Sequence, residues 1–524
     1  MPLAQAQLAG GGDGGVAQPG APDDPPFDLR GEGTPGHLLH RQARDHVVGP
    51  AEPARGALPT TRSGWGCPPG GRRQAPDGVR RIQGGRTGRI HGVYGPSGPH
   101  GSEGRRPVAA SPDTVDVLVV GAGLAGLACA RDLLAAGAGV RVLEAGDDVG
   151  GRMRSDLVDG FTVDRGFQVF NTSYPQVRRR LLPKALGLHP FTPGVLVHGP
   201  SGRLRFGDPA RRPRILPDLL TGRLAGPRDL AALGLLCARD GLLPANRIKR
   251  LPDTTARTAL ADAGISDALV EGFFRPFLSG VFLEDRLETS ARMFHLVWRS
   301  MLRGSLSLPD RGIGAVPQAL AAALPQGTVH LGSPVAELTG DGVLTAAGRE
   351  VAARAVVVAT GPGAVPSLLP EVALPAYRVV TTYYHVAPRS PLGEPTLLLD
   401  TRRRFLNTCV LSAVAPRYAP AGHALVATSV LGRDADGRER GVRAALAEAY
   451  GTATDGWDLL AARTVEDALP AMAPPQPLTR TTRVAPGRYV CGDHRATGSV
   501  QGALASGARA AREVLRDLGF PGRP

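Results

Sequence analysis

One stretch of the chain, residues 116–152, constrains the fold more than any other. It begins with the apolar run Val117–Val120, the pattern of a parallel strand that is buried on both faces. Three glycines in G-x-G-x-x-G spacing follow, and alanine- and leucine-rich residues over 124–136 predict a helix that ends at Gly137. Val140–Leu143 predicts a second strand. The order of strand, glycine turn, helix and strand predicts a βαβ unit.

The glycines and the acid of this unit indicate a dinucleotide site. Gly121 allows the tight turn, Gly123 lacks the Cβ that would hold a pyrophosphate away from the backbone, and Gly126 lets the helix pack close to the strand. The N–H groups at the start of the helix favour a diphosphate. Glu144 closes the second strand about 20 residues later, where a carboxylate can accept hydrogen bonds from both ribose hydroxyls. The alternative is a structural βαβ unit without a ligand.

A second glycine pair indicates which dinucleotide is bound. In GDDVGGRMRS, Gly150 and Gly151 permit close approach of the backbone, and Arg152 can pair bidentately with a phosphate. Without a ligand, the same residues would form a glycine turn followed by a surface arginine. The segment resembles the flavin amine oxidase superfamily, which includes amine oxidases, protoporphyrinogen oxidases and carotenoid desaturases. The resemblance implies that the segment lies against the diphosphate and ribityl chain of FAD.

Later segments carry the same resemblance. Asp164 and Gly166 match an element that returns the chain near the flavin. Residues 329–337, VHLGSPVAE, read as one strand, and Val335 matches the position whose backbone pairs with the adenine edge. Residues 355–360, AVVVAT, predict another buried parallel strand, and the turn after it matches one that lies next to the nucleotide in the superfamily.

The last match lies in residues 489–511. Tyr489–Cys491 predicts a strand that Gly492 and Asp493 end, and a helix of small residues follows. This is similar to the C-terminal flavin signature of the superfamily, where the acid holds the ribityl hydroxyls. The resemblance implies that the start of the helix faces the flavin, where its dipole would stabilise negative charge on the reduced ring. A tight contact between helix and sheet is the alternative.

The residues expected to hold FAD, without a covalent bond, come from all of these segments. They are Gly121, Gly123, Leu124, Ala125, Gly126, Glu144, Ala145, Gly151, Arg152, Gly166, Val335, Gly492, Asp493, Ser499 and Val500. The catalytic residues are not identified. His494 and Arg495 follow the ribityl acid and are candidates for tuning the flavin, with an ordinary surface turn as the alternative.

The predicted fold class is α/β, with a Rossmann-type FAD-binding domain that is discontinuous in sequence. An inserted α+β substrate domain contains an antiparallel sheet. Residues 1–112 are rich in Gly, Pro, Arg and Ala, and such a segment predicts a disordered extension. The FAD-binding segments are 113–190, 325–366 and 484–524, and the substrate-domain segments are 191–324 and 367–483.

The substrate region offers fewer signals. Phe273, Phe274, Phe277 and Phe282 fit either a hydrophobic chamber or an ordinary core. A second apolar stripe over residues 293–301 favours core, and His295 beside it favours a surface or capping histidine. Residues 195–206 predict a β-hairpin. Four apolar or alternating segments between residues 379 and 431 predict the antiparallel sheet, and Tyr383 and Tyr384 point to opposite faces, so one of them can face the pocket.

Composition excludes some classes of protein. The net charge is +14 and the pI about 10.4, but Lys184 and Lys249 are the only lysines, and no basic run alternates with aromatics, so no nucleic-acid partner is expected. Five cysteines lack disulfide or metal-ligand spacing, which fits a reducing, cytoplasmic compartment. No run of about 18 apolar residues predicts a spanning helix. Peripheral contact with the inner face of a membrane stays open, as does the oligomeric state.

The expected activity is that of an FAD-dependent oxidoreductase that takes hydride or two electrons from a bulky, apolar organic substrate. Neither lysine lies in a motif that would supply the active-site lysine common among amine oxidases, and no catalytic dyad is evident. Desaturase- or protoporphyrinogen-oxidase-like chemistry needs little acid–base machinery, because the flavin carries the reaction. The alternatives are a flavin amine oxidase, a flavin-dependent mutase or isomerase, and a flavin-binding regulatory protein.

Overall fold

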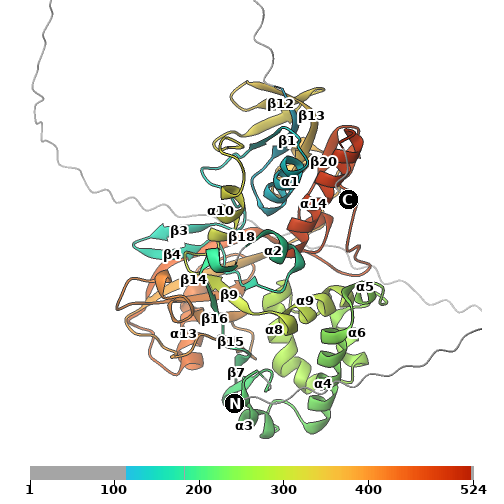
Figure 1. The fold of residues 1–524 in the computed structure, drawn as a ribbon. Helices are drawn as coiled ribbons and strands as arrows, with labels where there is room; N and C mark the ends of the chain where they lie inside the picture. Colours follow the sequence, from blue (N-terminus) through green and yellow to red (C-terminus); the bar gives the residue numbers. More distant parts are fainter. Residues whose placement is uncertain (1–113, 182, 210, 521–524) are drawn as a thin grey trace, which may run out of the picture. The chain divides into compact units, whose positions relative to one another are not determined.

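The computed structural model describes residues 114–181, 183–209 and 211–520 (Figure 1). The predicted disordered extension, residues 1–112, lies outside the described residues. The predicted domain boundaries within the described part stay predictions. In that part, none of the helices combines the length and the apolarity that crossing a membrane requires.

One eight-stranded sheet contains the apolar strands predicted from the sequence. Its central strand, β1 (Val115–Val120), pairs in parallel with β2 (Val140–Leu143) and with β13 (Glu350–Val358). Residues Leu118, Val119 and Val357 are fully buried, which explains the uninterrupted apolar runs. The other strands of this sheet are β10 (Val329–His330), β11 (Val335–Leu338), β12 (Gly342–Thr345), β19 (Arg483–Ala485) and β20 (Arg488–Val490).

The single strand predicted over residues 329–337 is wrong. The structure divides it into β10, which pairs in parallel with β2, and β11, which pairs antiparallel with β12. Gly332 has a φ of +59°, and Pro334 cannot donate a ladder hydrogen bond. These two residues end one strand and let the chain turn into the next.

Two helices pack against this sheet and against each other. They are α1 (Leu124–Ala135) and α14 (Val500–Asp517), which lie side by side in Figure 1. A Cβ at Gly507 would lie only 2.1 Å from the carbonyl oxygen of Ala125, so the close approach requires glycine. The hydroxyl of Ser499 accepts a hydrogen bond from Gly502 N at 3.1 Å and caps α14. The predicted helix of small residues is therefore confirmed.

A second, seven-stranded sheet includes the predicted β-hairpin and the predicted antiparallel strands. Every neighbouring pair is antiparallel except β15 and β7, which are parallel. The 13-residue strand β18 was not predicted. In spatial order the strands are β18 (Asp458–Pro470), β14 (Tyr377–Ala387), β17 (Ala424–Leu431), β16 (Asn407–Val410), β15 (Leu397–Asp400), β7 (Val195–Gly199) and β8 (Gly202–Phe206).

The region between β8 and β10 is largely helical. Its longest helices, α4 and α9, pack against each other. The helices are α3 (Leu216–Leu220), α4 (Pro227–Leu242), α5 (Ala245–Ile248), α6 (Ala256–Asp262), α7 (Asp267–Leu269), α8 (Arg275–Phe282), α9 (Ala291–Arg303) and α10 (Ala315–Ala322).

The expectation that His295 is a surface or capping residue is wrong. Its side chain is buried between α9 and α4, where Nδ1 lies 2.7 Å from a carboxylate oxygen of Asp240. Asp240 is itself fully buried, so the two polar groups satisfy each other. This contact joins residues 55 positions apart, and no local pattern shows it.

Small elements complete the described part. β3 (Ser155–Val158) pairs with β4 (Phe161–Asp164), and a three-stranded sheet has the order β5 (Phe170–Asn171), β9 (Leu306–Pro309), β6 (Leu188–Pro190). The remaining α-helices are α2 (Pro175–Arg180), α11 (Val365–Leu368), α12 (Leu411–Val414) and α13 (Arg438–Tyr450).

Candidate functional site

A cavity of about 600 Å³ is lined by residues of both large sheets and of helices α8 and α9. Most of the residues predicted to hold the cofactor line it. They are Gly121, Gly123, Leu124, Ala125, Glu144, Ala145, Gly151, Arg152, Gly166, Val335, Gly492, Asp493, Ser499 and Val500. The structure thus brings the glycine turn, the second glycine pair and the C-terminal segment together around one space.

Gly126 is the predicted residue that lies outside the lining. A Cβ at this position would lie 2.0 Å from the carbonyl oxygen of Gly121, so the glycine lets α1 lie close to the end of β1. A Cβ at Gly123 would meet no protein atom within 4 Å. The two glycines therefore differ: one is needed for packing within the protein, and the other keeps space free in the cavity.

Glu144 is held in the cavity wall by backbone N–H groups. Its carboxylate accepts hydrogen bonds from Ala122 N at 2.6 Å and from Gly146 N at 2.9 Å. These bonds tie the end of β2 to the first glycine turn. Each carboxylate oxygen can accept more than one hydrogen bond, so Glu144 keeps acceptor capacity towards the cavity.

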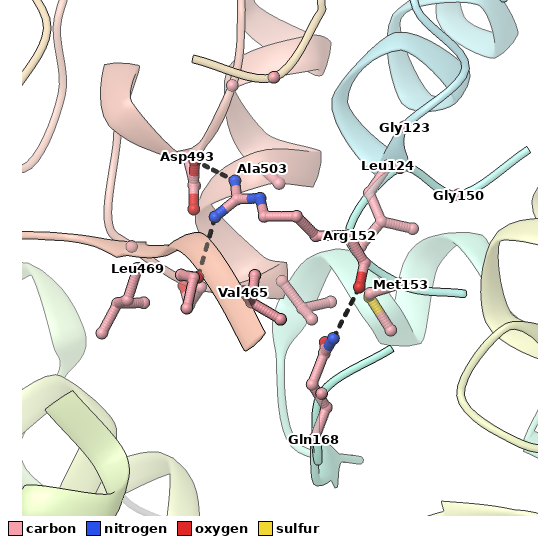
Figure 2. A pocket seen from close by; sticks show the side chains of 18 of the residues that line it. Gly123, Leu124, Gly150, Arg152, Met153, Gln168, Val465, Leu469, Asp493 and Ala503 are labelled. Carbon is pink, nitrogen blue, oxygen red and sulfur yellow. Dashed lines mark hydrogen bonds and ion pairs between the residues drawn. The ribbon is translucent and has the colours of Figure 1, made fainter. Parts of the chain in front are cut away.

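Arg152 crosses the cavity wall and joins two distant segments (Figure 2). Nη2 donates to a carboxylate oxygen of Asp493 at 2.7 Å, and Nη1 donates to the carbonyl oxygens of Asp467 and Ala468 at 3.1 and 3.0 Å. Burial alone would lower the pKa of Arg152, but the neighbouring Asp493 carboxylate raises it overall. The sequence predicted that this guanidinium pairs with phosphate. In the structure these N–H groups bind protein oxygens.

Residues near Arg152 that the sequence did not single out also line the cavity. Gln168 Nε2 donates to the carbonyl oxygen of Arg152 at 2.8 Å, and Val465 and Leu469 of β18 lie below the guanidinium in Figure 2. They come from segments without a recognisable motif. Only the pairing of β18 with β14 places its side chains here.

Helices α8 and α9 supply an apolar wall. All four predicted phenylalanines belong to one buried cluster, and two of them, Phe277 and Phe282, also line the cavity. The assignment of the α9 stripe to the core is confirmed, since Met293, Phe294, Val297 and Trp298 belong to one buried cluster and Met301 packs against it. Three of these residues, Met293, Val297 and Met301, also line the cavity, which the sequence did not predict.

The prediction that Tyr383 or Tyr384 can face the pocket is wrong, because neither lines the cavity. Tyr384 lies in the core and donates its hydroxyl to the carbonyl oxygen of Asp164 at 2.8 Å. Tyr383 lies on the opposite face and donates to the Asp434 carboxylate. The alternation of the strand was predicted correctly, but the partners of the two rings were not.

Asp164 is fully buried just before the lining residues Arg165, Gly166 and Phe167. Its carboxylate accepts hydrogen bonds from Ser155 Oγ at 2.6 Å, Ile313 N at 3.0 Å and the Tyr418 hydroxyl at 2.9 Å. Burial raises the pKa of Asp164 to about 6, although these hydrogen bonds lower it. The carboxyl group thus fixes the segment that enters the cavity wall.

The two candidates for tuning the flavin have different environments. His494 lines the cavity, and burial lowers its pKa to about 4, so the ring is neutral at pH 7. Its Nε2 is buried without a hydrogen-bond partner among the described residues. Arg495 lies outside the lining and donates to the carbonyl oxygen of Thr481.

Comparison with known proteins connects this geometry to a family. Residues 124–515 match the family of flavin-containing amine oxidoreductases. Coproporphyrinogen III oxidase of Propionibacterium freudenreichii subsp. freudenreichii is 30% identical over 184 residues, 33% of each protein. Carotenoid phi-ring synthase of Streptomyces griseus is 32% identical over 216 residues, 37% of this chain and 40% of that protein. The curated relatives are matched over 11 to 40% of their own length.

Solved structures share the fold. Cyclohexylamine oxidase from Brevibacterium oxydans IH-35A has a TM-score of 0.57 at 19% identity, covering 78% of this chain and 100% of that one. Reduced UDP-galactopyranose mutase has a TM-score of 0.55 at 15% identity, covering 78% and 96%. The family model matches three quarters of the chain, so this chain belongs to the family of flavin-containing amine oxidoreductases.

Proposed function

We propose that the chain binds FAD without a covalent bond and oxidises an uncharged, mainly apolar organic molecule. The cavity has two ends with different chemistry. We call the part lined by Gly121, Gly123, Glu144, Arg152 and Asp493 the nucleotide end. The part lined by α8, α9 and strands β14 to β17 is the substrate end.

The nucleotide end fits a dinucleotide. No side chain caps α1, and the place of a Cβ at Gly123 is free of protein atoms, so a diphosphate can approach the first N–H groups of the helix. Glu144 would accept hydrogen bonds from the ribose, and Asp493 from the ribityl chain. The sheet containing β1, β2, β13 and β20 supports a Rossmann-type domain assembled from separate stretches of sequence. None of the four described cysteines lines the cavity, which supports non-covalent binding.

The proposal for the substrate rests on the lack of charged side chains at the substrate end. None of the lining residues contributed by α8, α9 and β14 to β17 is charged, and both lysines lie outside the lining. An ammonium or carboxylate would lose its hydration there without a compensating partner, which is costly. Apolar side chains instead favour an apolar molecule through burial of its surface.

Bound FAD would accept a hydride, two electrons and a proton, from a substrate carbon. The residues of this chain would do three other things. The apolar wall would exclude water and orient the substrate. The first N–H groups of α14 would stabilise negative charge at the flavin. His494, neutral at pH 7, would add a polar but uncharged group beside it.

Cytoplasmic location, absence of a nucleic-acid partner and peripheral membrane contact also stay proposals.

Anaerobic reduction of the bound flavin tests this function. Purified protein should show the visible spectrum of a flavin, and polyprenoid or porphyrinogen compounds should bleach it without added reductant, whereas amines should not. Bleaching by amines alone would indicate an amine oxidase instead. Turnover of pre-reduced protein only would indicate a mutase, and a folded protein that takes up no flavin would refute the proposal.

A further inference from the structure

Three polar side chains form a row across the substrate-end face of the seven-stranded sheet. Thr382 of β14 is paired in register with Ser429 of β17, and Ser429 with Asn407 of β16. Residues directly opposite each other on neighbouring strands share a face, so these side chains are adjacent. We call them the polar row. Ser429 and Asn407 line the cavity, and Thr382 is buried behind them.

The surroundings of the polar row are apolar. Val380, Leu397 and Leu399 line the cavity from neighbouring positions of the same sheet, and Phe277 and Val297 line it from the helices. An apolar side chain would suit the position of Asn407 at least as well for packing alone. Gly280 of α8 leaves room for the amide, because a Cβ there would lie 2.8 Å from Asn407 Nδ2.

The hydrogen bonds of the polar row are incomplete. Phe167 N donates to Thr382 Oγ1 at 3.3 Å, and Thr382 Oγ1 lies 3.2 Å from Ser429 Oγ. When Thr382 donates its proton to Ser429, the proton of Ser429 remains available. Asn407 Oδ1 is buried and has no hydrogen-bond partner among the described residues. Leaving such an acceptor unpaired is costly, whereas a ligand that pairs with it recovers the loss.

We propose that the polar row binds one neutral group of an otherwise apolar substrate, a hydroxyl or a carboxamide. Asn407 accepts a hydrogen bond from this group once its amide turns to bring the buried Oδ1 to the cavity, and Ser429 donates one to it. The inference rests on the proposed function, because it assumes that the substrate end holds the substrate. It makes Asn407 and Ser429 specificity-determining residues.

Calorimetric titration of the full-length, flavin-containing protein tests the assignment with two probes of similar shape. 1-Octanol can donate and accept a hydrogen bond, whereas methyl octyl ether can only accept one. In Asn407→Leu the ratio of alcohol affinity to ether affinity should fall about tenfold relative to wild type. Ser429→Ala, which removes a single atom, should weaken both probes to a similar degree. Thr408→Val is the matched control, since Thr408 bonds to Thr428 and Tyr450 away from the cavity.

An unchanged alcohol-to-ether ratio in Asn407→Leu would overturn the assignment, as would the absence of saturable octanol binding to wild type. Ser429→Ala keeps the test decisive if Asn407→Leu does not fold. If Ser429→Ala leaves both affinities unchanged, the inference is wrong. Flavin absorbance of the same samples separates the two proposals. Protein that lacks flavin but keeps the octanol preference would refute the proposed function and support the polar row.

Discussion

The two ends of the cavity are built in different ways. At the nucleotide end, the important positions have no side chain or use the backbone: Gly123 leaves space, Gly126 permits close packing, and backbone N–H groups hold Glu144. At the substrate end, the surface consists of side chains such as Phe277 and Met293. One end is therefore specified by short sequence spacing, and the other by how distant elements pack.

This difference predicts that substitutions at the nucleotide end act through the backbone. Gly126→Ala should have the largest effect, because its Cβ would lie 2.0 Å from the carbonyl oxygen of Gly121 and α1 would have to move. We expect a loss of more than ~3 kcal/mol in the free energy of unfolding, together with loss of flavin. Denaturant unfolding and flavin absorbance measure the two effects.

Gly123→Ala, at the N-cap of the same helix, is the matched control. Its Cβ meets no protein atom within 4 Å, so flavin-free protein should unfold at nearly the wild-type denaturant concentration while flavin affinity falls. Equal unfolding behaviour of the two variants would show that the two glycines do not divide packing and binding in this way.

The same contrast explains which features the sequence could predict. The βαβ unit and the helix α14 were predicted, because glycine spacing and apolar runs are local signals. The strand β18 was not, although Val465 and Leu469 help to form the cavity. Its position depends on register with β14, which no short pattern encodes.

The contacts between site residues were harder to predict than the residues themselves. The sequence identified Arg152 and Asp493 separately, but not their contact across 341 positions. It also assigned the whole α9 stripe to the core, because a helical period shows that a face is covered but does not show whether protein or a cavity covers it. Met293 and Phe294 belong to the same buried cluster, but only Met293 also lines the cavity.

Asp164, which directly precedes the lining residues Arg165 to Phe167, should make stability depend on pH. Its pKa is raised to about 6 in the folded protein, from an ordinary value of 3.8, so the folded state binds more protons between these values. The titration of Asp164 should therefore lower the free energy of unfolding as pH rises from about 4 to 6, by on the order of 3 kcal/mol. His494, whose pKa is lowered to about 4, contributes with the opposite sign over the same range. Between pH 4 and 6 the free energy of unfolding of Asp164→Asn should therefore rise relative to that of wild type, as measured by denaturant unfolding at several pH values.

Asp156 provides a control of opposite sign. Its hydrogen bond to Arg165 lowers its pKa, so its contribution to stability is lost only as the pH falls below about 4. Asp156→Asn should leave the slope between pH 4 and 6 unchanged. If Asp164→Asn also leaves that slope unchanged, Asp164 does not titrate in this pH range.

Arg152 tests the limits of the comparison between the two ends, because at the nucleotide end it is a side chain that joins distant segments. Arg152→Met would leave the buried Asp493 carboxylate unpaired and release the carbonyl oxygens of β18. Since about a third of the arginine side chain is exposed, solvent screening reduces the cost, and we expect a loss of about 2 kcal/mol in the free energy of unfolding. Flavin affinity should fall as Asp493 moves.

Arg165→Met is the matched control for this substitution. Arg165 also lines the cavity and pairs with a carboxylate, that of Asp156, but both groups are more exposed. Its loss should cost under about 1 kcal/mol. If Arg152→Met keeps wild-type stability and loses only flavin, its main partner is the phosphate, as the sequence predicted. If stability and flavin are lost together, Arg152 acts by holding Asp493 in place, and the nucleotide end depends on a long-range side-chain contact just as the substrate end does.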